Sequence, residues 1–255
     1  MSGSHAHALY FHGHSAVHRL PGAVKLAALF VYVLAVVATP PTFFPAMVVH
    51  VAVLLTALAF SELPVGFFLR RLLVDIPFVL FALFLPLVGT APHIEVGFLS
   101  LSVPGLYAAW NIIVKATLGV GASVIVGGTT EVPEIVAGLE RLRVPRLMTA
   151  IISSMVRYME VVGDEFKRAR IAMEARGFRA RWLGHARPLA TSAGALFIRS
   201  YERGERVYQA MAARGFTGHM PDLEERGPIS PGQWATGLAP AAVSLVAAAA
   251  ALLLT

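Results

Sequence analysis

Two copies of one short motif are the clearest functional feature of the chain. Residues 172–178 read Ala-Met-Glu-Ala-Arg-Gly-Phe and residues 210–216 read Ala-Met-Ala-Ala-Arg-Gly-Phe, so six of seven positions are identical at an offset of 38. Arg168 and Arg206 share this offset. Arginine is always charged, and its forked guanidinium matches a carboxylate. We therefore interpret the arginine in each motif as a docking group that pairs with an acid inside a groove.

Each copy also contains the residues that end a helix. Gly177 and Gly215 can take the positive φ of the position that follows a helix, and the phenylalanine after each can supply the usual apolar contact. Arg176 and Arg214 favour the negative end of the helix dipole by about 0.3–1 kcal/mol. This explains each ending alone, but not why both endings share nearly the same residues. We therefore expect both helix ends to meet similar surfaces, either a two-fold partner or two related subunits.

Histidines are concentrated at the start of the chain, where five of the nine lie within the first 18 residues. The spacing of His5 with His7, and of His12 with His14, could bind Co²⁺, Ni²⁺ or Zn²⁺ through imidazole nitrogens. The same residues could instead form a solvated tail without fixed geometry, which is the interpretation we favour.

The composition places these groups in a membrane protein. Only 14% of the residues are charged and 56% are hydrophobic, whereas a soluble domain carries about 25% charged residues. The high apolar content excludes a disordered chain. The absence of cysteine excludes a disulfide scaffold, a thiol nucleophile and a cysteine-ligated metal. We find no P-loop, G-x-S-x-G or H-E-x-x-H motif, so the chain is not expected to be an enzyme.

The uncharged stretches predict five transmembrane helices, because one helical span needs about 20 apolar residues. Prolines between positions 40 and 45 divide the long uncharged run that starts at Leu26 into two spans. The predicted spans are Leu20–Thr39, Thr42–Phe60, Leu72–Ile94, Val96–Thr130 and Trp234–Leu254.

Residues 128–233 form a charged insert before the last span, with 16 of the 21 Lys+Arg and 12 of the 15 Asp+Glu. Apolar residues from Met148 to Met173 alternate at intervals of four and three, which indicates one helical stripe. Its methionines could form a surface that repacks as a partner moves, or simply fill a core. The helices expected in the insert are Pro133–Arg143, Arg146–Arg176 and Pro188–Arg214.

The distribution of lysine and arginine predicts the orientation, because cytoplasmic loops carry an excess of both. The insert and the segment that contains Arg70 and Arg71 are therefore expected on the cytoplasmic side, with the N-terminus, and no cleavable signal peptide is recognised. The expected organisation is a His-rich cytoplasmic segment at 1–19, four transmembrane helices within 20–127, a cytoplasmic coupling-helix domain at 128–233 and a last transmembrane helix at 234–255.

Lys115 is a charge within a predicted span, where it costs at least about 2.5–3.5 kcal/mol. It is therefore expected to face a protein interior or a water-filled cleft, or to snorkel. A direct pair with Asp75 is disfavoured, because the predicted boundaries separate the two in depth by about 13 Å. Asn111, one turn away, makes a contact of Asn111 and Lys115 with a partner subunit a hypothesis.

The paired motifs resemble those of the transmembrane T component of energy-coupling-factor (ECF) transporters. Ala175-Arg176-Gly177 and Ala213-Arg214-Gly215 are both intact, and the layout of spans and insert extends the resemblance over most of the chain. The stretch from His18 to Leu26, together with the length, resembles the cobalt (CbiQ-type) branch of that family.

The resemblance implies an all-α polytopic protein of the bacterial inner membrane with a division of labour among subunits. Two cytoplasmic ATPase subunits would bind ATP and Mg²⁺, and a separate small membrane protein would bind the substrate, expected to be cobalt. This chain would bind no cofactor and no nucleic acid, and would dock its two Ala-Arg-Gly ends on the ATPases. The alternatives are nickel or a vitamin as the substrate, a polytopic membrane enzyme, or a permease with its own pathway.

Overall fold

The computed structural model describes residues 10–90, 92–96, 99–178, 186–216 and 227–254. These residues fall into two compact units, which are described separately. The apolar unit contains the described residues of His7–Leu142 and Gly227–Thr255, and the charged unit contains those of Arg143–Arg226.

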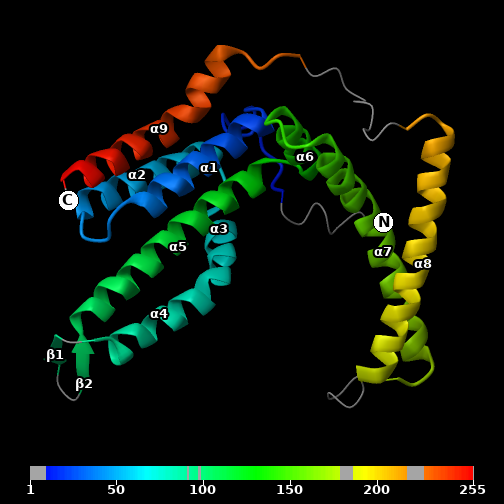
Figure 1. The fold of residues 1–255 in the computed structure, drawn as a ribbon, viewed down its shortest axis with the longest axis horizontal. Coiled ribbons are helices and arrows are strands. Elements are labelled where there is room, and N and C mark those ends of the chain that lie inside the picture. The colour runs from blue at the N-terminus through cyan, green and yellow to red at the C-terminus, as the bar shows by residue number, and fades with distance from the viewer. Residues whose placement is uncertain (1–9, 91, 97–98, 179–185, 217–226, 255) are drawn as a thin grey trace. The chain divides into compact units, whose positions relative to one another are not determined.

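The apolar unit is almost entirely helical (Figure 1). Four segments are long and apolar enough to cross a membrane, namely α2, the stretch Val65–Val88, α5 and α9, and α1 is a shorter apolar helix. The predicted all-α polytopic membrane protein is therefore confirmed. The elements are α1 (Gly22–Ala38), α2 (Phe44–Ser61), α3 (Val65–Leu72), the 3-10 turn η1 (Leu73–Asp75), α4 (Ile76–Val88), β1 (His93–Val96), β2 (Leu99–Ser102), α5 (Val103–Thr129), α6 (Val132–Arg141) and α9 (Pro231–Leu254).

The third predicted span differs from the structure at both of its ends, and the fourth differs at its start. The connection predicted at 61–71 is largely helical, because α3 continues through η1 into α4. Helix α4 ends before Ile94 because β1 and β2 pair as an antiparallel hairpin. Helix α5 consequently begins at Val103 instead of Val96, where the Ser102 hydroxyl accepts a hydrogen bond from the Gly105 amide at 3.2 Å. A serine N-cap of this kind stabilises a helix start.

Helix α9 packs against α1 and α2 through a face of small residues. An ideal Cβ added to Gly237 would overlap Cγ1 of Val24 on α1. Small residues at membrane helix interfaces allow this close backbone approach, which increases van der Waals contact. The buried residues of this face recur at alternating intervals of four and three: Gly237, Ala241, Ser244, Ala248 and Ala251.

Helix α6 belongs with the apolar helices. It packs on the start of α1, where a Cβ added to Gly138 would lie 2.8 Å from the backbone nitrogen of Ala23. The sequence predicts this helix, as Pro133–Arg143, within the charged insert at 128–233. In the structure the charged unit begins at Arg143, beyond α6.

The charged unit consists of two long helices, α7 (Arg146–Ala175) and α8 (Ala186–Ala213). Helix α7 has 30 residues, which corresponds to about 45 Å. Both helices occur where the sequence predicts them, although α8 begins two residues before Pro188. Figure 1 shows them running past each other in opposite directions, so that their C-terminal ends lie at opposite ends of the pair.

Candidate docking site at the ends of two helices

Helix α7 ends in a Schellman motif. Gly177 has a φ of +81°. Its amide donates to the carbonyl of Glu174 at 3.0 Å, and the amide of Phe178 donates to the carbonyl of Met173 at 3.0 Å. These two bonds satisfy carbonyls that the end of a helix otherwise leaves without a partner.

Helix α8 ends in the same way. Gly215 has a φ of +80°. Its amide donates to Ala212 at 3.0 Å, and the Phe216 amide donates to Met211 at 3.0 Å. A Cβ added to either terminal glycine would meet nothing within 4 Å. The positive φ, and not crowding, therefore requires glycine at both ends.

The two ends present the same residues to solvent. Arg176 and Arg214 are both exposed, and the phenylalanine that follows each motif is half-buried. At each of these helix ends, called the tips below, the glycine thus lies between an exposed arginine and a half-buried phenylalanine. The six residues predicted to dock are all exposed: Ala175, Arg176, Gly177, Ala213, Arg214 and Gly215.

An ion pair joins the two helices at equivalent positions of the repeat. The Arg203 guanidinium on α8 contacts the Glu165 carboxylate on α7, and the two residues are 38 positions apart, which is the offset of the motifs. When equivalent positions of two antiparallel helices contact each other, a local two-fold axis relates the helices. The repeat is visible in the sequence, but this contact is not.

Part of the apolar stripe of α7 is exposed in the described part of the chain. Met148 is 58% exposed, Met155 is 63% exposed and Met159 is 60% exposed. The reading of these methionines as core residues is therefore wrong for all three. Met220, in the same insert, lies outside the described residues. Exposed thioether side chains at helical spacing form a flexible apolar surface that suits a partner helix.

Lys115 donates a hydrogen bond to a backbone carbonyl in the last turn of another helix of the apolar unit. Its Nζ donates to the Val37 carbonyl of α1 at 2.8 Å, in the last turn, where the helix dipole favours a cation. The Asp75 carboxylate instead accepts a hydrogen bond from Thr117 at 2.8 Å. Oδ1 of Asn111 is buried without a hydrogen-bond partner among the described residues.

Lys25 makes the reciprocal contact between the same two helices. Its Nζ donates to the Thr129 carbonyl at the end of α5, at 2.8 Å, and lies 3.9 Å from a Glu134 carboxylate oxygen of α6. Lys25 of α1 thus donates to a carbonyl at the end of α5, and Lys115 of α5 donates to a carbonyl at the end of α1. The sequence alone does not indicate this role of Lys25, because its acceptor lies 104 positions away.

The histidines of the N-terminal segment are only partly described by the structure. No group of three or more potential ligands occurs in the part of the chain that the structure describes, which includes His12 and His14; His5 and His7 lie outside it. His18 contacts the Phe11 carbonyl through Nε2 at 2.9 Å and Ser15 through Nδ1 at 2.7 Å. Both of its ring nitrogens are therefore occupied.

A comparison with protein families matches residues 13–224 to the family described as CbiQ, cobalt transport protein. The match includes both Ala-Arg-Gly ends and most of the predicted spans. The chain belongs to the CbiQ cobalt transport protein family. This membership confirms the resemblance drawn from the paired motifs, and identifies the chain as a transporter membrane component.

Two relatives are similar along most of the chain, and another is similar over about a third of it. The cobalt transport protein CbiQ of Rhodobacter capsulatus is 26% identical over 201 residues, which are 78% of this chain and 80% of that protein. The energy-coupling factor transporter transmembrane protein EcfT of Bacillus selenitireducens is 26% identical over 226 residues, 82% of each chain. The nickel permease LarQ of Lactiplantibacillus plantarum is 31% identical over 91 residues, 36% of this chain and 33% of that protein.

Proposed function

We propose that this chain is the coupling subunit of an ATP-driven ECF-type importer, joining two cytoplasmic ATPase subunits to a substrate-binding membrane protein. The observation that supports this most is the pair of matching caps at the ends of α7 and α8, related by the contact of Glu165 with Arg203. Two equivalent helix ends suit two equivalent binding grooves, one on each ATPase subunit. The ATPases bind ATP and Mg²⁺, and this chain contributes no catalytic group.

Docking follows from the chemistry of the tips. Arg176 and Arg214 each pair with a carboxylate in a groove of one ATPase, where a charge-assisted hydrogen bond contributes about 1.5–3 kcal/mol. When the ATPase pair closes, the tips move relative to each other about the contact between α7 and α8. The exposed methionine surface of α7 then repacks against the substrate-binding subunit, because unbranched thioether side chains adapt to a moving surface.

The orientation follows from the distribution of basic residues. The charged unit holds most of the lysine and arginine, so we place it and the N-terminus in the cytoplasm, with the spans in the bacterial inner membrane. We also retain the hypothesis that Asn111 and Lys115 contact a partner subunit. The unpartnered Oδ1 of Asn111 supports it, and normal assembly and transport by Lys115→Met would contradict it.

We propose cobalt as the substrate, which does not bind this chain. The family and the Rhodobacter capsulatus protein are both named for cobalt transport. The similarity to a protein named nickel permease favours nickel as the second candidate. Uptake of radiolabelled Co²⁺ and Ni²⁺ by cells with and without this chain distinguishes the two, and accumulation of Ni²⁺ alone would contradict cobalt.

Charge reversal at the tips tests the docking. The tagged chain, expressed with the products of its neighbouring genes, is expected to co-purify with the ATPases and a small membrane protein. Arg176→Glu with Arg214→Glu should abolish recovery of the ATPases while leaving membrane insertion intact. The matched control is Arg168→Glu with Arg206→Glu, which makes the same charge change at exposed positions of the same helices. Equal recovery from both double variants would contradict the role of the tips.

A further inference from the structure

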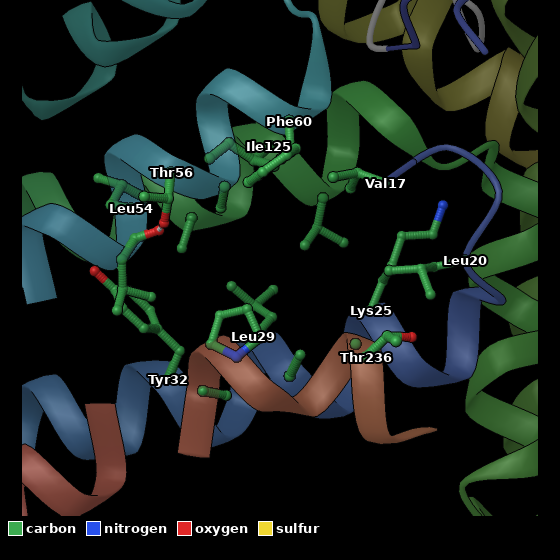
Figure 2. A pocket seen from close by; sticks show the side chains of 18 of the residues that line it. Val17, Leu20, Lys25, Leu29, Tyr32, Leu54, Thr56, Phe60, Ile125 and Thr236 are labelled. Atoms are coloured by element: carbon green, nitrogen blue, oxygen red, sulfur yellow. Dashed lines mark hydrogen bonds between the residues drawn. The ribbon is translucent and has the colours of Figure 1, made fainter. Parts of the chain in front are cut away.

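The apolar unit contains a cavity of about 460 Å³ that the coupling function does not use. Figure 2 shows Leu29 of α1, Leu54 of α2 and Ile125 of α5 around this space. Pro240 of α9 contributes the fourth wall. A volume of this size is typical of a ligand pocket.

The cavity lies at one end of the bundle. Its lining comes from the first half of α1, the last turns of α2, the last turns of α5 and the first half of α9. These parts of the helices correspond to one leaflet of the bilayer, which is about 15 Å deep in hydrocarbon. Residues Val17 and Leu20, which precede α1, line the same end.

The polar side chains around the cavity are engaged within the protein. Tyr32 donates to the carbonyl of His50 at 2.9 Å. Thr56 donates to a carbonyl of its own helix at 2.8 Å, and Thr236 does so at 2.9 Å. The amine of Lys25 donates to the end of α5, so this residue presents its aliphatic stem. The cavity therefore offers apolar surface and suits neither an ion nor a polar solute.

The size and the lining of the cavity suit a hydrocarbon chain. A space of about 460 Å³ is within the range of ligand pockets, and its apolar lining matches a flexible apolar group.

The helices around the cavity indicate where such a chain comes from. The cavity is partly open, and helices long and apolar enough to cross a membrane surround it. Helix α9 bends in its first half (Figure 1), where Pro240 lies within the helix. Proline removes a backbone hydrogen bond and kinks a helix. In a bilayer, lipid tails surround helices of this kind.

We propose that this cavity binds one acyl chain of a phospholipid from the surrounding bilayer. The chain fills the space between α9 and the pair formed by α1 and α2, and thereby completes the packing of the bundle. The inference rests on the cavity alone and does not depend on the ATPase docking proposed above.

Filling the cavity tests the proposal. Ala57 lines the cavity on α2, whereas Ala59 is exposed on the same helix and is not part of the lining. The full chain, isolated with its partners, is washed with detergent, and the phospholipid retained per chain is counted by native mass spectrometry. Wild type and Ala59→Phe should retain one phospholipid, and Ala57→Phe should retain none. Ala28→Phe on α1 is the second filling variant, in case Ala57→Phe does not fold.

Thermal unfolding provides an independent measurement, because a ligand that binds only the folded protein raises its stability. Removing lipid completely and adding back phosphatidylglycerol should lower and then restore the unfolding midpoint of wild type and of Ala59→Phe. The midpoint of the folded filling variant should respond less. Retention of phospholipid by the filling variants equal to wild type would overturn the proposal, as would a wild type that loses all lipid without a shift.

Discussion

Glu165 of α7 and Arg203 of α8 contact each other at equivalent positions of the internal repeat. Arg176 follows Glu165 by 11 residues, and Arg214 follows Arg203 by the same number. At 1.5 Å per residue, each tip lies about 16 Å along its helix from the contact. Because the helices run in opposite directions, Arg176 and Arg214 are equally displaced from the contact on opposite sides. A partner with two-fold symmetry can therefore engage both.

A charge swap tests the importance of this contact. Glu165→Arg or Arg203→Glu alone places like charges together, which should reduce substrate uptake and destabilise the pair by about 1 kcal/mol or less, since Arg203 is 39% exposed. The swapped double variant should recover uptake and stability, because the attraction is restored. Uptake and thermal unfolding of all four proteins form a double-mutant cycle. A swapped variant no better than the worse single variant would contradict the proposed contact.

Replacing the terminal glycines should weaken docking without changing any charge. Gly177→Ala and Gly215→Ala force a Cβ into the left-handed region, which costs about 1–2 kcal/mol. Because the exposed arginine precedes this turn, ATPase affinity should fall by about 5–30-fold. Asparagine, which tolerates this conformation, should cost less.

Gly163→Ala is the matched control for the glycine variants. Gly163 lies inside α7, and a Cβ there would meet nothing within 4 Å. This change should stabilise the helix by up to about 1 kcal/mol, opposite in sign to the terminal variants. Binding of the purified ATPase to immobilised chain measures all of them. An affinity unchanged by Gly177→Ala would show that the turn does not position the arginine.

Local rules allowed the tips to be predicted from the sequence. A glycine after a helical stripe carries its own conformational preference, so the positive φ of Gly177 and Gly215 follows without knowledge of the rest of the chain. The long helices followed from their hydrophobic period. The start of α5 was missed because it depends on the pairing of residues 93–102 as a hairpin. Strand pairing of such short segments leaves little local signal.

Contacts between distant residues could not be predicted. Lys115 was visible as a costly charge, but the acceptors of Lys25 and Lys115 belong to the ends of helices far away in the sequence. The buried face of α9 was hidden for a different reason, because alanine and glycine occur on all sides of that helix. Which side is buried depends on where α1 lies.

The two lysines should differ in their effect on stability. Lys25 is only 3% exposed, so Lys25→Met removes a buried bond to the Thr129 carbonyl and should cost about 1.5–3 kcal/mol. Lys115 is partly exposed, and Lys115→Met should cost about 1 kcal/mol or less through loss of the favourable dipole contact. Thermal unfolding in lipid nanodiscs compares the two. A larger loss for Lys115→Met than for Lys25→Met would refute the reciprocal arrangement.

The close approach of α9 to α1 makes a sharper prediction at Gly237. A methyl group there would overlap Val24, so Gly237→Ala should destabilise the bundle by about 1–3 kcal/mol. Adding Val24→Ala removes the overlapping group and should recover part of the loss, giving a non-additive pair. Gly232→Ala is the control, because its Cβ would meet only Ser230 Oγ, at 3.9 Å.

These variants separate packing from helix propensity. Alanine favours a helix over glycine by up to about 1 kcal/mol, so propensity alone predicts that Gly237→Ala and Gly232→Ala both stabilise α9. Packing predicts opposite signs for the two changes. Thermal unfolding of wild type, Gly237→Ala, Gly237→Ala with Val24→Ala, and Gly232→Ala in nanodiscs gives the sign of each change in stability directly. A Gly237→Ala protein at least as stable as wild type would mean that α9 and α1 are not held in contact at this residue.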